Sequence, residues 1–417
     1  METQVKRINA IFPWFKGLNS DLLFFVAVNT LFLSVVKGLS AFEISLLSTV
    51  SLVVCLVFQR LTLKLIKKIG NTASMRVGTG MLICASLLLT FGNNLTLLII
   101  GYIFYEGAWF FKSVESVILK NNLIADNREK EYMKIKSKGS MIYAVVTAII
   151  ALVSGALFNI DHYLPMYMCI LVCIFCFLLS FYIKEFDVEK KQNKTSKKKE
   201  HFLKLGGIIW LVIITFAIFY TSLNLGQGNS KLLMQYTLTD NIGISKAATY
   251  LSVIIAISRI VRVVGNIVFS KVYYKFKDKI CYILSLILLL AFCSIILGFF
   301  VNSTIIVKII FMSLGFFCFL AIRDPFNNYI QELILRVSKK DIQETAIYYL
   351  EVVKKLFSAT IKIAITIMLS KYDLIYAIII LGICSAIEVV MAIRLYCLIL
   401  NQKKEKAVEY ELNSEEN

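Results

Sequence analysis

The sequence predicts an all-α integral membrane protein of about twelve transmembrane helices, arranged as two pseudo-symmetric six-helix bundles. Its 417 residues are 58% hydrophobic and 17% charged, with a mean hydropathy of +0.76. This composition is too apolar for a soluble domain of that length. Apolar runs that could cross a bilayer recur along the whole chain, and short sequence matches relate its two halves. Together these observations predict a duplicated bundle of membrane spans.

Six apolar runs make up the predicted N-terminal bundle, residues 1–183. They lie at residues 11–36, 44–66, 77–92, 96–119, 140–158 and 164–183. A helix needs about 20 apolar residues to cross the hydrocarbon core, so each run is a candidate span. The first run is longer than a signal-peptide core and has no small-residue cleavage site, so we expect it to be the first span.

A polar segment at residues 184–204 separates the two halves. It contains Lys-Thr-Ser-Lys-Lys-Lys at 194–199, a run of charge that predicts a solvated cytoplasmic linker. The second half has apolar runs at residues 206–225, 246–270, 280–300, 304–326, 344–369 and 374–400. They predict a C-terminal six-helix bundle over residues 205–400, followed by a cytoplasmic polar tail at 401–417.

The distribution of Lys and Arg predicts the orientation of the spans. With a cytoplasmic N-terminus, the cytoplasmic segments hold 31 Lys and Arg residues and the external segments hold 4. Cationic loops are retained on the cytoplasmic side, so both termini are expected to be cytoplasmic. The richness in Lys, Ile and Asn suggests a bacterium with an AT-rich genome, and therefore a bacterial cell membrane.

The basic net charge of +18 is thus a signal of topology, and we expect no nucleic-acid partner. The 10 Cys residues lie largely in apolar runs, where a thiol behaves as a small hydrophobe, so no disulfide framework is expected. Cys169, Cys173 and Cys176 share a helical face without a fourth ligand, which favours packing over a metal site. The absence of a Gly-rich phosphate loop predicts no nucleotide cofactor and no direct use of ATP.

Two short matches at nearly the same offset indicate an internal repeat. Gly38-Leu39-Ser40 and Gly243-Ile244-Ser245 both precede the second span of their half. Asn121-Asn122 and Asn327-Asn328 both close the fourth span. Parallel repeats of this kind are a common construction in transporters.

Six spans, a basic loop and six more spans resemble the Major Facilitator Superfamily over nearly the whole chain. The family's Asp-Arg-x-Gly motif after the second span corresponds to Lys67-Lys68-Ile69-Gly70, which keeps the base and the glycine but not the acid. In span four, Glu106-Gly107 stands where many drug-transporting members have Gln-Gly. In span five, Ser154-Gly155 lacks their Gly-Pro signature. The architecture therefore resembles the superfamily, whereas the motifs do not establish a drug-exporting branch.

The resemblance implies that helices 1, 4, 7 and 10 line a central cavity. It implies a monomeric secondary transporter, not an enzyme, that moves a small solute by alternating access. Coupling to protons is a separate expectation, which rests on Asp21. Two alternatives stay open: a transport-inactive membrane sensor of the same fold, and a polytopic membrane enzyme, for which only His162 and His201 would supply imidazole.

Charges inside the spans are the best pointers to function, because a charged side chain at the bilayer centre costs about 2.5 to 3.5 kcal/mol on insertion scales. Asp21 lies in the middle of the first span beside Phe24 and Phe25. An apolar setting would let its carboxyl group bind and release a proton, so Asp21 is the proton-coupling candidate. Phe24 and Phe25 are candidates for the substrate cavity. A fixed salt bridge or polar helix contact is the structural alternative for Asp21.

The fourth span carries Glu106, Trp109, Lys112 and Glu115. Lys112 and Glu115 are three residues apart and share a face, which favours a structural ion pair. Glu106 lies on another face, and with Trp109 it is a candidate for contact with the substrate.

The later spans carry further candidates for a charge network or gate. Arg259 and Arg262 in the eighth span could bind an anionic substrate, but we favour an internal network with Asp21, Glu106 or Asp324. Arg323 and Asp324 precede Pro325, where a bend could form a gate latch or a helix end. The remaining candidates of this kind are Glu351 and Lys355, for which local pairing along the helix, with Lys354 included, is expected.

The seventh span loses hydrophobicity at Asn224-Leu225-Gly226-Gln227-Gly228-Asn229. Paired glycines and amides can break a helix and free backbone groups for a ligand, so Asn224 is a candidate for the substrate cavity. The simple alternative is an external loop.

Overall fold

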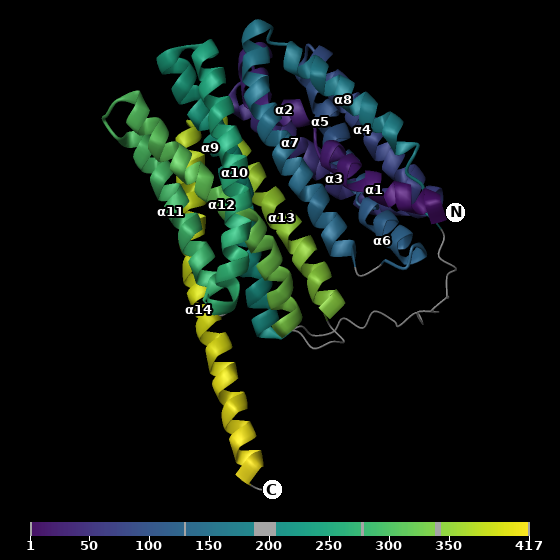
Figure 1. Cartoon of the computed structure of the whole chain (residues 1–417). Coiled ribbons are helices and arrows are strands. Elements are labelled where there is room, and N and C mark those ends of the chain that lie inside the picture. The colour runs from purple at the N-terminus through teal and green to yellow at the C-terminus, as the bar shows by residue number, and fades with distance from the viewer. Residues whose placement is uncertain (1, 129–130, 187–205, 277–278, 338–342, 416–417) are drawn as a thin grey trace. The chain divides into compact units, whose positions relative to one another are not determined.

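The computed structural model describes residues 2–128, 131–186, 206–276, 279–337 and 343–415 (Figure 1). The chain forms two compact units. Unit 1 comprises Met1–Lys198 and Leu238–Ile260, and unit 2 comprises Lys199–Thr237 and Val261–Asn417. Most of the predicted linker at 184–204 lies outside the described residues.

Helices account for nearly all the described residues, and no strand occurs among them. The helices of unit 1 are α1 (Glu2–Asn19), α2 (Leu23–Leu31), the π-helix η1 (Phe32–Val36), α3 (Ala41–Ile69), α4 (Asn71–Phe91), α5 (Leu95–Lys112), α6 (Glu115–Ala125), α7 (Tyr132–Ile160) and α8 (Leu164–Ser180). α9 (Gly207–Ile242) and α10 (Ile244–Phe276) contribute to both units. Unit 2 also contains α11 (Ile280–Phe300), α12 (Ile305–Val337), α13 (Gln343–Leu369) and α14 (Leu374–Glu415).

The helices match the predicted spans. Within the described residues, ten helical stretches are long and apolar enough to cross a membrane. The shorter apolar helix α8 and the helix α13, which carries Glu351, Lys354 and Lys355, occupy the two remaining predicted runs. The prediction of an all-α membrane protein with about twelve spans is confirmed.

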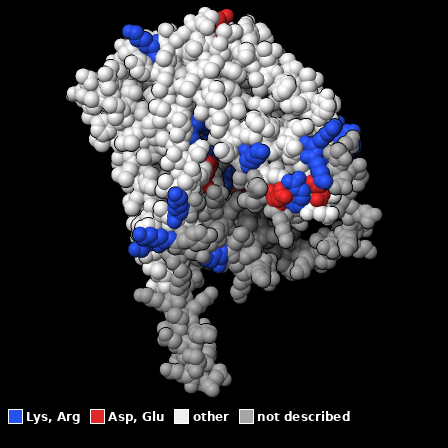
Figure 2. Space-filling model, viewed as in Figure 1, with Lys and Arg blue, Asp and Glu red and all other residues white. Residues whose placement is uncertain are grey.

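The surface of the spans is apolar. Large hydrophobic side chains such as Val57 (71% exposed), Ile160 (76%) and Ile306 (68%) face outward. Figure 2 shows one face of the molecule on which most described residues are uncharged and Lys and Arg gather in a few patches. Such a surface is costly in water but is solvated by lipid tails.

The first and fourth spans are broken near their middles, which the apolar runs did not predict. α1 ends at Asn19 and α2 begins at Leu23, whereas α5 ends at Lys112 and α6 begins at Glu115. Each break contains a serine whose hydroxyl donates to a backbone carbonyl on the preceding turn. Side-chain bonds of this kind compete with helical hydrogen bonding.

The seventh span, in contrast, is not broken at residues 224–229, so the predicted break and the alternative loop are both wrong. α9 runs without interruption from Gly207 to Ile242. The amide of Asn224 donates to the Tyr220 carbonyl (2.8 Å) and that of Asn229 to the Leu225 carbonyl (2.9 Å). These amides bond back to their own helix and leave its backbone ladder intact.

Two helices continue further than the sequence suggested. α12 contains Pro325 and extends to Val337, so the helix does not end at Asp324, although the apolar stretch within it ends at Asn327 as the run at 304–326 predicted. α14 continues through the predicted polar tail as far as Glu415. Hydropathy marks where a helix leaves the apolar layer and not where its hydrogen bonding stops.

The sequence repeat has a structural counterpart. Gly38 and Gly243 both have positive φ, +67° and +78°, and they precede α3 and α10, the second span of each half. This left-handed conformation suits glycine because it has no Cβ. In both halves the same backbone turn therefore leads into the second span.

Candidate functional site

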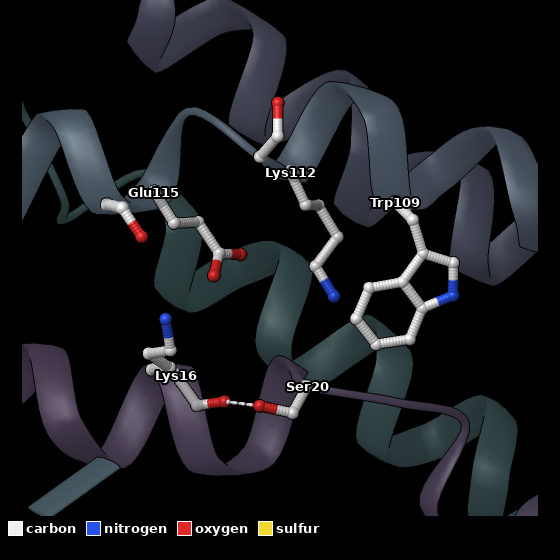
Figure 3. Close-up of a pocket in the computed structure, with 7 residues that line it drawn as sticks. Lys16, Ser20, Trp109, Lys112 and Glu115 are labelled. Atoms are coloured by element: carbon white, nitrogen blue, oxygen red, sulfur yellow. Dashed lines mark hydrogen bonds between the residues drawn. The ribbon is translucent and has the colours of Figure 1, made fainter. Parts of the chain in front are cut away.

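A cavity of about 190 Å³ lies in unit 1 where the two broken spans meet (Figure 3). α1 and the segment after it supply Lys16 and Ser20, and the α5–α6 region supplies the rest of the lining: Trp109, Lys112, Ser113, Glu115 and Ser116. Figure 3 shows Lys16, Lys112, Glu115 and Trp109 directed toward a common space.

The cavity lies near the middle of both spans. The first membrane-spanning stretch covers Val5–Val36 and the fourth covers Leu95–Ala125. Ser20 and Lys112 are therefore each close to the centre of their stretch. Transporters commonly place their binding sites at this depth and build them from discontinuous helices.

The break in the first span is stabilised by its own side chains. The Ser20 hydroxyl donates to the Lys16 carbonyl, as the dashed line in Figure 3 marks. The Asp21 carboxylate accepts from the Leu22 amide at 2.8 Å, immediately before α2 begins. An acidic side chain at a helix N-terminus satisfies free amides and complements the helix dipole.

Asp21 also joins three helical segments. Its Oδ1 accepts a hydrogen bond from the Tyr105 hydroxyl of α5 (2.7 Å), and its Oδ2 accepts one from the Tyr143 hydroxyl of α7 (3.3 Å). With the Leu22 amide, three donors face this carboxylate. Its charge is therefore matched by hydrogen bonds although it lies in the middle of a span.

The second break is organised around Asn19, the last residue of α1. Its amide nitrogen lies 3.1 Å from Glu115 Oε1 and 3.1 Å from Thr79 Oγ1. The Lys112 ammonium donates to the Asn19 carbonyl and lies 5.0 Å from the Trp109 ring centroid. Asn19 thus bridges the end of α5 and the start of α6. Lys112 and Glu115 are 4% and 7% exposed.

Charges of suitable sign stand at all four helix ends created by the breaks. Lys16 is in the last turn of α1 and Lys112 in the last turn of α5, whereas Asp21 precedes α2 and Glu115 is in the first turn of α6. Cations stabilise helix C-termini and anions stabilise N-termini. The intramembrane charges thereby offset the cost of interrupting two spans.

The structure brings some of the predicted site residues together. Trp109, Lys112 and Glu115 line the cavity, and Asp21 directly follows Ser20, which lines it. Phe24 and Phe25 are buried instead, and Phe25 packs edge-on against Tyr105, with ring centroids 6.5 Å apart. Glu106 is not among the residues that line the cavity.

Sequence reasoning missed several residues of this region, namely Lys16, Asn19, Ser20, Tyr105, Ser113, Ser116 and Tyr143. The polar run Asn19-Ser20-Asp21 inside an apolar stretch was a visible signal for the first break. The two tyrosines gave no local signal, since their partner Asp21 is distant in sequence.

In unit 2, Arg262 and Asp324 form a bidentate ion pair, with nitrogen to oxygen distances of 2.8 and 2.7 Å. Asn266 donates to the same carboxylate at 2.8 Å. Arg323, beside Asp324, donates to the side chain of Gln227 at 3.3 Å. One of the internal pairings considered for the arginines, Arg262 with Asp324, is therefore present.

The other candidates in unit 2 lie on α13 and α9. Glu351 pairs with Lys354 at 2.7 Å, three residues along the helix. Lys355 on the same helix is half-buried. Asn224 is half-buried on α9 and bonded to its own helix.

Arg259 differs from Arg262. It lies near the middle of the stretch Ile244–Tyr273, and its side chain is 7% exposed. Its Nε is buried without an acceptor, and among the described residues it has no ion pair. The network expected for the two arginines thus accounts for Arg262 alone.

The sequence model of the Major Facilitator Superfamily matches residues 17–347. No curated protein matches the sequence at a significant level.

Solved structures of transporters share the fold. The nucleoside transporter NupG aligns with a TM-score of 0.67 at 13% identity, over 95% of this chain and 98% of that one. A bacterial homologue of the iron transporter ferroportin aligns with a TM-score of 0.68 at 14% identity, over 94% and 98%. A D-xylose-proton symporter aligns with a TM-score of 0.66 at 11% identity, over 94% and 97%. At these identities the likeness shows a common fold.

Proposed function

This chain belongs to the Major Facilitator Superfamily and is a membrane transporter, and we propose that it is a secondary active transporter that moves a small solute by alternating access, coupled to protons. The observation that carries this proposal is the cavity at the breaks of the first and fourth spans. Two discontinuous spans that meet at mid-membrane leave helix ends and backbone groups available for a solute.

The cavity supports a solute of modest size. Its volume of about 190 Å³ is below the range of roughly 300 to 1,000 Å³ typical of pockets for drug-sized ligands. Trp109 supplies an aromatic surface, and the serines and charged groups supply hydrogen bonds. We propose Trp109 as a substrate contact, with Lys112 and Glu115 as polar groups that orient the solute.

Asp21 is our candidate for proton coupling. Its carboxylate accepts bonds from α5, from α7 and from the start of α2. A proton on Asp21 would turn an acceptor into a donor and would weaken these contacts together. Protonation at this one position would therefore loosen the junction of three helical segments beside the cavity.

In unit 2, we propose that the pairs Arg262–Asp324 and Glu351–Lys354, together with Arg323 and Lys355, act as a charge network or gate. We propose that the protein works as a monomer in a bacterial cell membrane with both termini cytoplasmic.

Solute-induced proton movement in inside-out membrane vesicles tests this function. A chemically broad panel of solutes is added to vesicles with the wild-type protein, Asp21→Asn or the control Asp373→Asn, at matched expression. Asp373 is an exposed aspartate between α13 and α14. We expect one solute class to move protons with the wild type and the control but not with Asp21→Asn.

The other results separate the parts of the proposal. Equal proton movement with wild type and Asp21→Asn would show that Asp21 is not the coupling site. Solute uptake without proton movement would leave a transporter with another driving force. If no solute is taken up and none moves protons, a transport-inactive sensor of the same fold is favoured.

A further inference from the structure

We propose that the solute is a small organic anion, bound in the cavity of unit 1 by Lys16 and Lys112 and also by Arg259, which does not line this cavity but is buried near the middle of its own span in the same unit. The inference rests on the proposed function, because it assigns a substrate class to the transporter. Two separate observations support it. One is a buried arginine that has no partner among the described residues, and the other is a cavity whose lysines have free donors while the acid in its lining, Glu115, already accepts a hydrogen bond.

The first observation is the state of Arg259. A charge at the centre of a span is costly, so it normally pairs with an opposite charge or faces a water-filled cavity. Arg259 is 93% buried, and in the described part of the chain its guanidinium has no hydrogen bond or ion pair. A planar guanidinium with free donors matches a carboxylate or phosphate.

Arg262 provides an internal comparison on the same helix. Its guanidinium holds the Asp324 carboxylate through two hydrogen bonds of 2.8 and 2.7 Å. Among the described residues, an acid pairs with the arginine nearer the end of the span and none pairs with the one at its centre. An anionic ligand would form with Arg259 the ion pair that Asp324 forms with Arg262.

The second observation concerns the two lysines of the cavity. The Lys112 ammonium donates to one backbone carbonyl, and an ammonium has three donors. The Lys16 ammonium faces the cavity (Figure 3), and within the described residues its side chain has no hydrogen bond or ion pair. Both lysines can therefore bind a ligand without giving up a protein acceptor.

The nearby acids are better satisfied than the bases. Asp21 accepts from Tyr105, Tyr143 and the Leu22 amide. Glu115 accepts from Asn19 and stands in the favourable first turn of α6. Glu106 does not line the cavity. Neutral donors therefore hold Asp21 and Glu115, whereas donors on Lys16 and Lys112 remain available to a ligand.

The ligand class follows from these groups and from the cavity. Ammonium and guanidinium donors favour a carboxylate or phosphate, and the volume of about 190 Å³ favours a compact molecule. Trp109, which is 40% exposed, would pack against an apolar part of it. A neutral solute of the same shape would bring no negative charge to these cations.

Binding to the purified protein tests this inference independently of transport. Thermal stabilisation in detergent is measured with matched carboxylates and amides: lactate with lactamide, succinate with succinamide, and benzoate with benzamide, plus inorganic phosphate. We expect at least one anion to stabilise the wild type, with its neutral amide at least about thirtyfold weaker in apparent affinity.

The variants are Arg259→Gln, Arg259→Lys and Lys16→Gln, with Arg394→Gln as control. Arg394 is an exposed arginine on α14 without an ion pair in the described chain. We expect Arg259→Gln and Lys16→Gln to weaken anion binding by about tenfold or more, Arg259→Lys to retain part of it, and the control to bind like the wild type. Lys16→Gln is less disruptive to folding, because the Lys16 side chain is half-buried and makes no hydrogen bond among the described residues.

The inference is overturned if amides bind as well as carboxylates, if no anion stabilises the wild type, or if Arg259→Gln and Lys16→Gln bind the anion normally. Anion binding without solute movement in vesicles would refute the transport function and keep the anion site. Transport of neutral solutes only would support the transport function and overturn the anion site.

Discussion

At the scale of single residues, Asp21 shows how a carboxylate is held inside a membrane span. Its partners Tyr105 and Tyr143 come from other helices, and their hydroxyls replace the water that the carboxylate would otherwise bind. The same contacts that stabilise the charge connect α5 and α7 to the break before α2. A structural role and the proposed coupling role therefore use the same hydrogen bonds.

Tyr105→Phe should destabilise the protein, because it removes the shortest of the three hydrogen bonds that the Asp21 carboxylate accepts. Hydrogen bonds to charged groups contribute about 1.5 to 3 kcal/mol, and the half-buried position of Asp21 favours the lower end. The measurement is thermal unfolding in detergent. Tyr102→Phe is the matched control, since Tyr102 lies on the same helix and also packs against Phe25. Equal unfolding temperatures for the two variants would show that the bond to Asp21 contributes nothing.

Asp324→Asn should also destabilise the protein, because it leaves the Arg262 guanidinium without its carboxylate inside a span. Removal of one partner from a buried pair costs about 3 to 5 kcal/mol, and side-chain exposures of 21% and 25% reduce this toward about 2 kcal/mol. Arg394→Gln, at an exposed arginine of α14 with no ion pair in the described chain, is the control and should change stability by less than about 0.5 kcal/mol. An effect of Asp324→Asn no larger than that of Arg394→Gln in thermal unfolding would contradict this account.

At the scale of helices, continuity is decided by where polar side chains find partners. Asn224 and Asn229 bond to carbonyls of α9 itself, and α9 remains a helix. Ser20 and Asp21 also form local hydrogen bonds. The Asp21 carboxylate, however, accepts a hydrogen bond from the Leu22 amide, which then makes no helical hydrogen bond, and it also accepts hydrogen bonds from hydroxyl groups of two other helices. Polar residues of similar type thus preserve one span and break another.

Gly226 and Gly228 test the continuity of α9 directly. A Cβ on Gly226 would lie 2.6 Å from the Phe292 ring, whereas a Cβ on Gly228 meets nothing within 4 Å. We expect Gly226→Ala to destabilise the protein by about 1 to 3 kcal/mol through overpacking. Gly228→Ala should stabilise it by about 0.5 to 1 kcal/mol, because alanine is the better helix former. Thermal unfolding in detergent measures both. Destabilisation by Gly228→Ala would indicate that the segment is not helical.

At the scale of the whole molecule, the two halves share a plan but differ at the cavity. Gly38 and Gly243 occupy the same left-handed turn before the second span of each half. The first and fourth spans of the first half are broken, whereas their counterparts α9 and α12 are continuous. The repeat therefore preserves the scaffold while the polar breaks are confined to one half of the described chain.

Gly38→Ala and Gly243→Ala should have similar effects if the repeat is structural. Neither added Cβ has a neighbour within 4 Å, so the cost comes from the left-handed backbone alone, about 1 to 2 kcal/mol each. Gly207→Ala at the start of α9 is the control, because its φ is not positive and its surroundings are open. Unfolding temperatures should fall for the first two variants and stay level for the control. A lower unfolding temperature for only one of the two variants would argue against structurally equivalent turns.

The sequence by itself determined the fold class, the number of spans and the family, because hydropathy and motif spacing depend on residue type and position along the chain. It also singled out Asp21, Trp109, Lys112 and Glu115, since charged and aromatic residues stand out in an apolar run. Only the tertiary structure decided which spans are broken, that Asn19 joins Lys112 to Glu115, and that Arg262 has an acidic partner while Arg259 has none within the described residues. Those outcomes depend on partners that are distant in sequence, and no local pattern encodes which donor a folded chain will bring to a given acceptor.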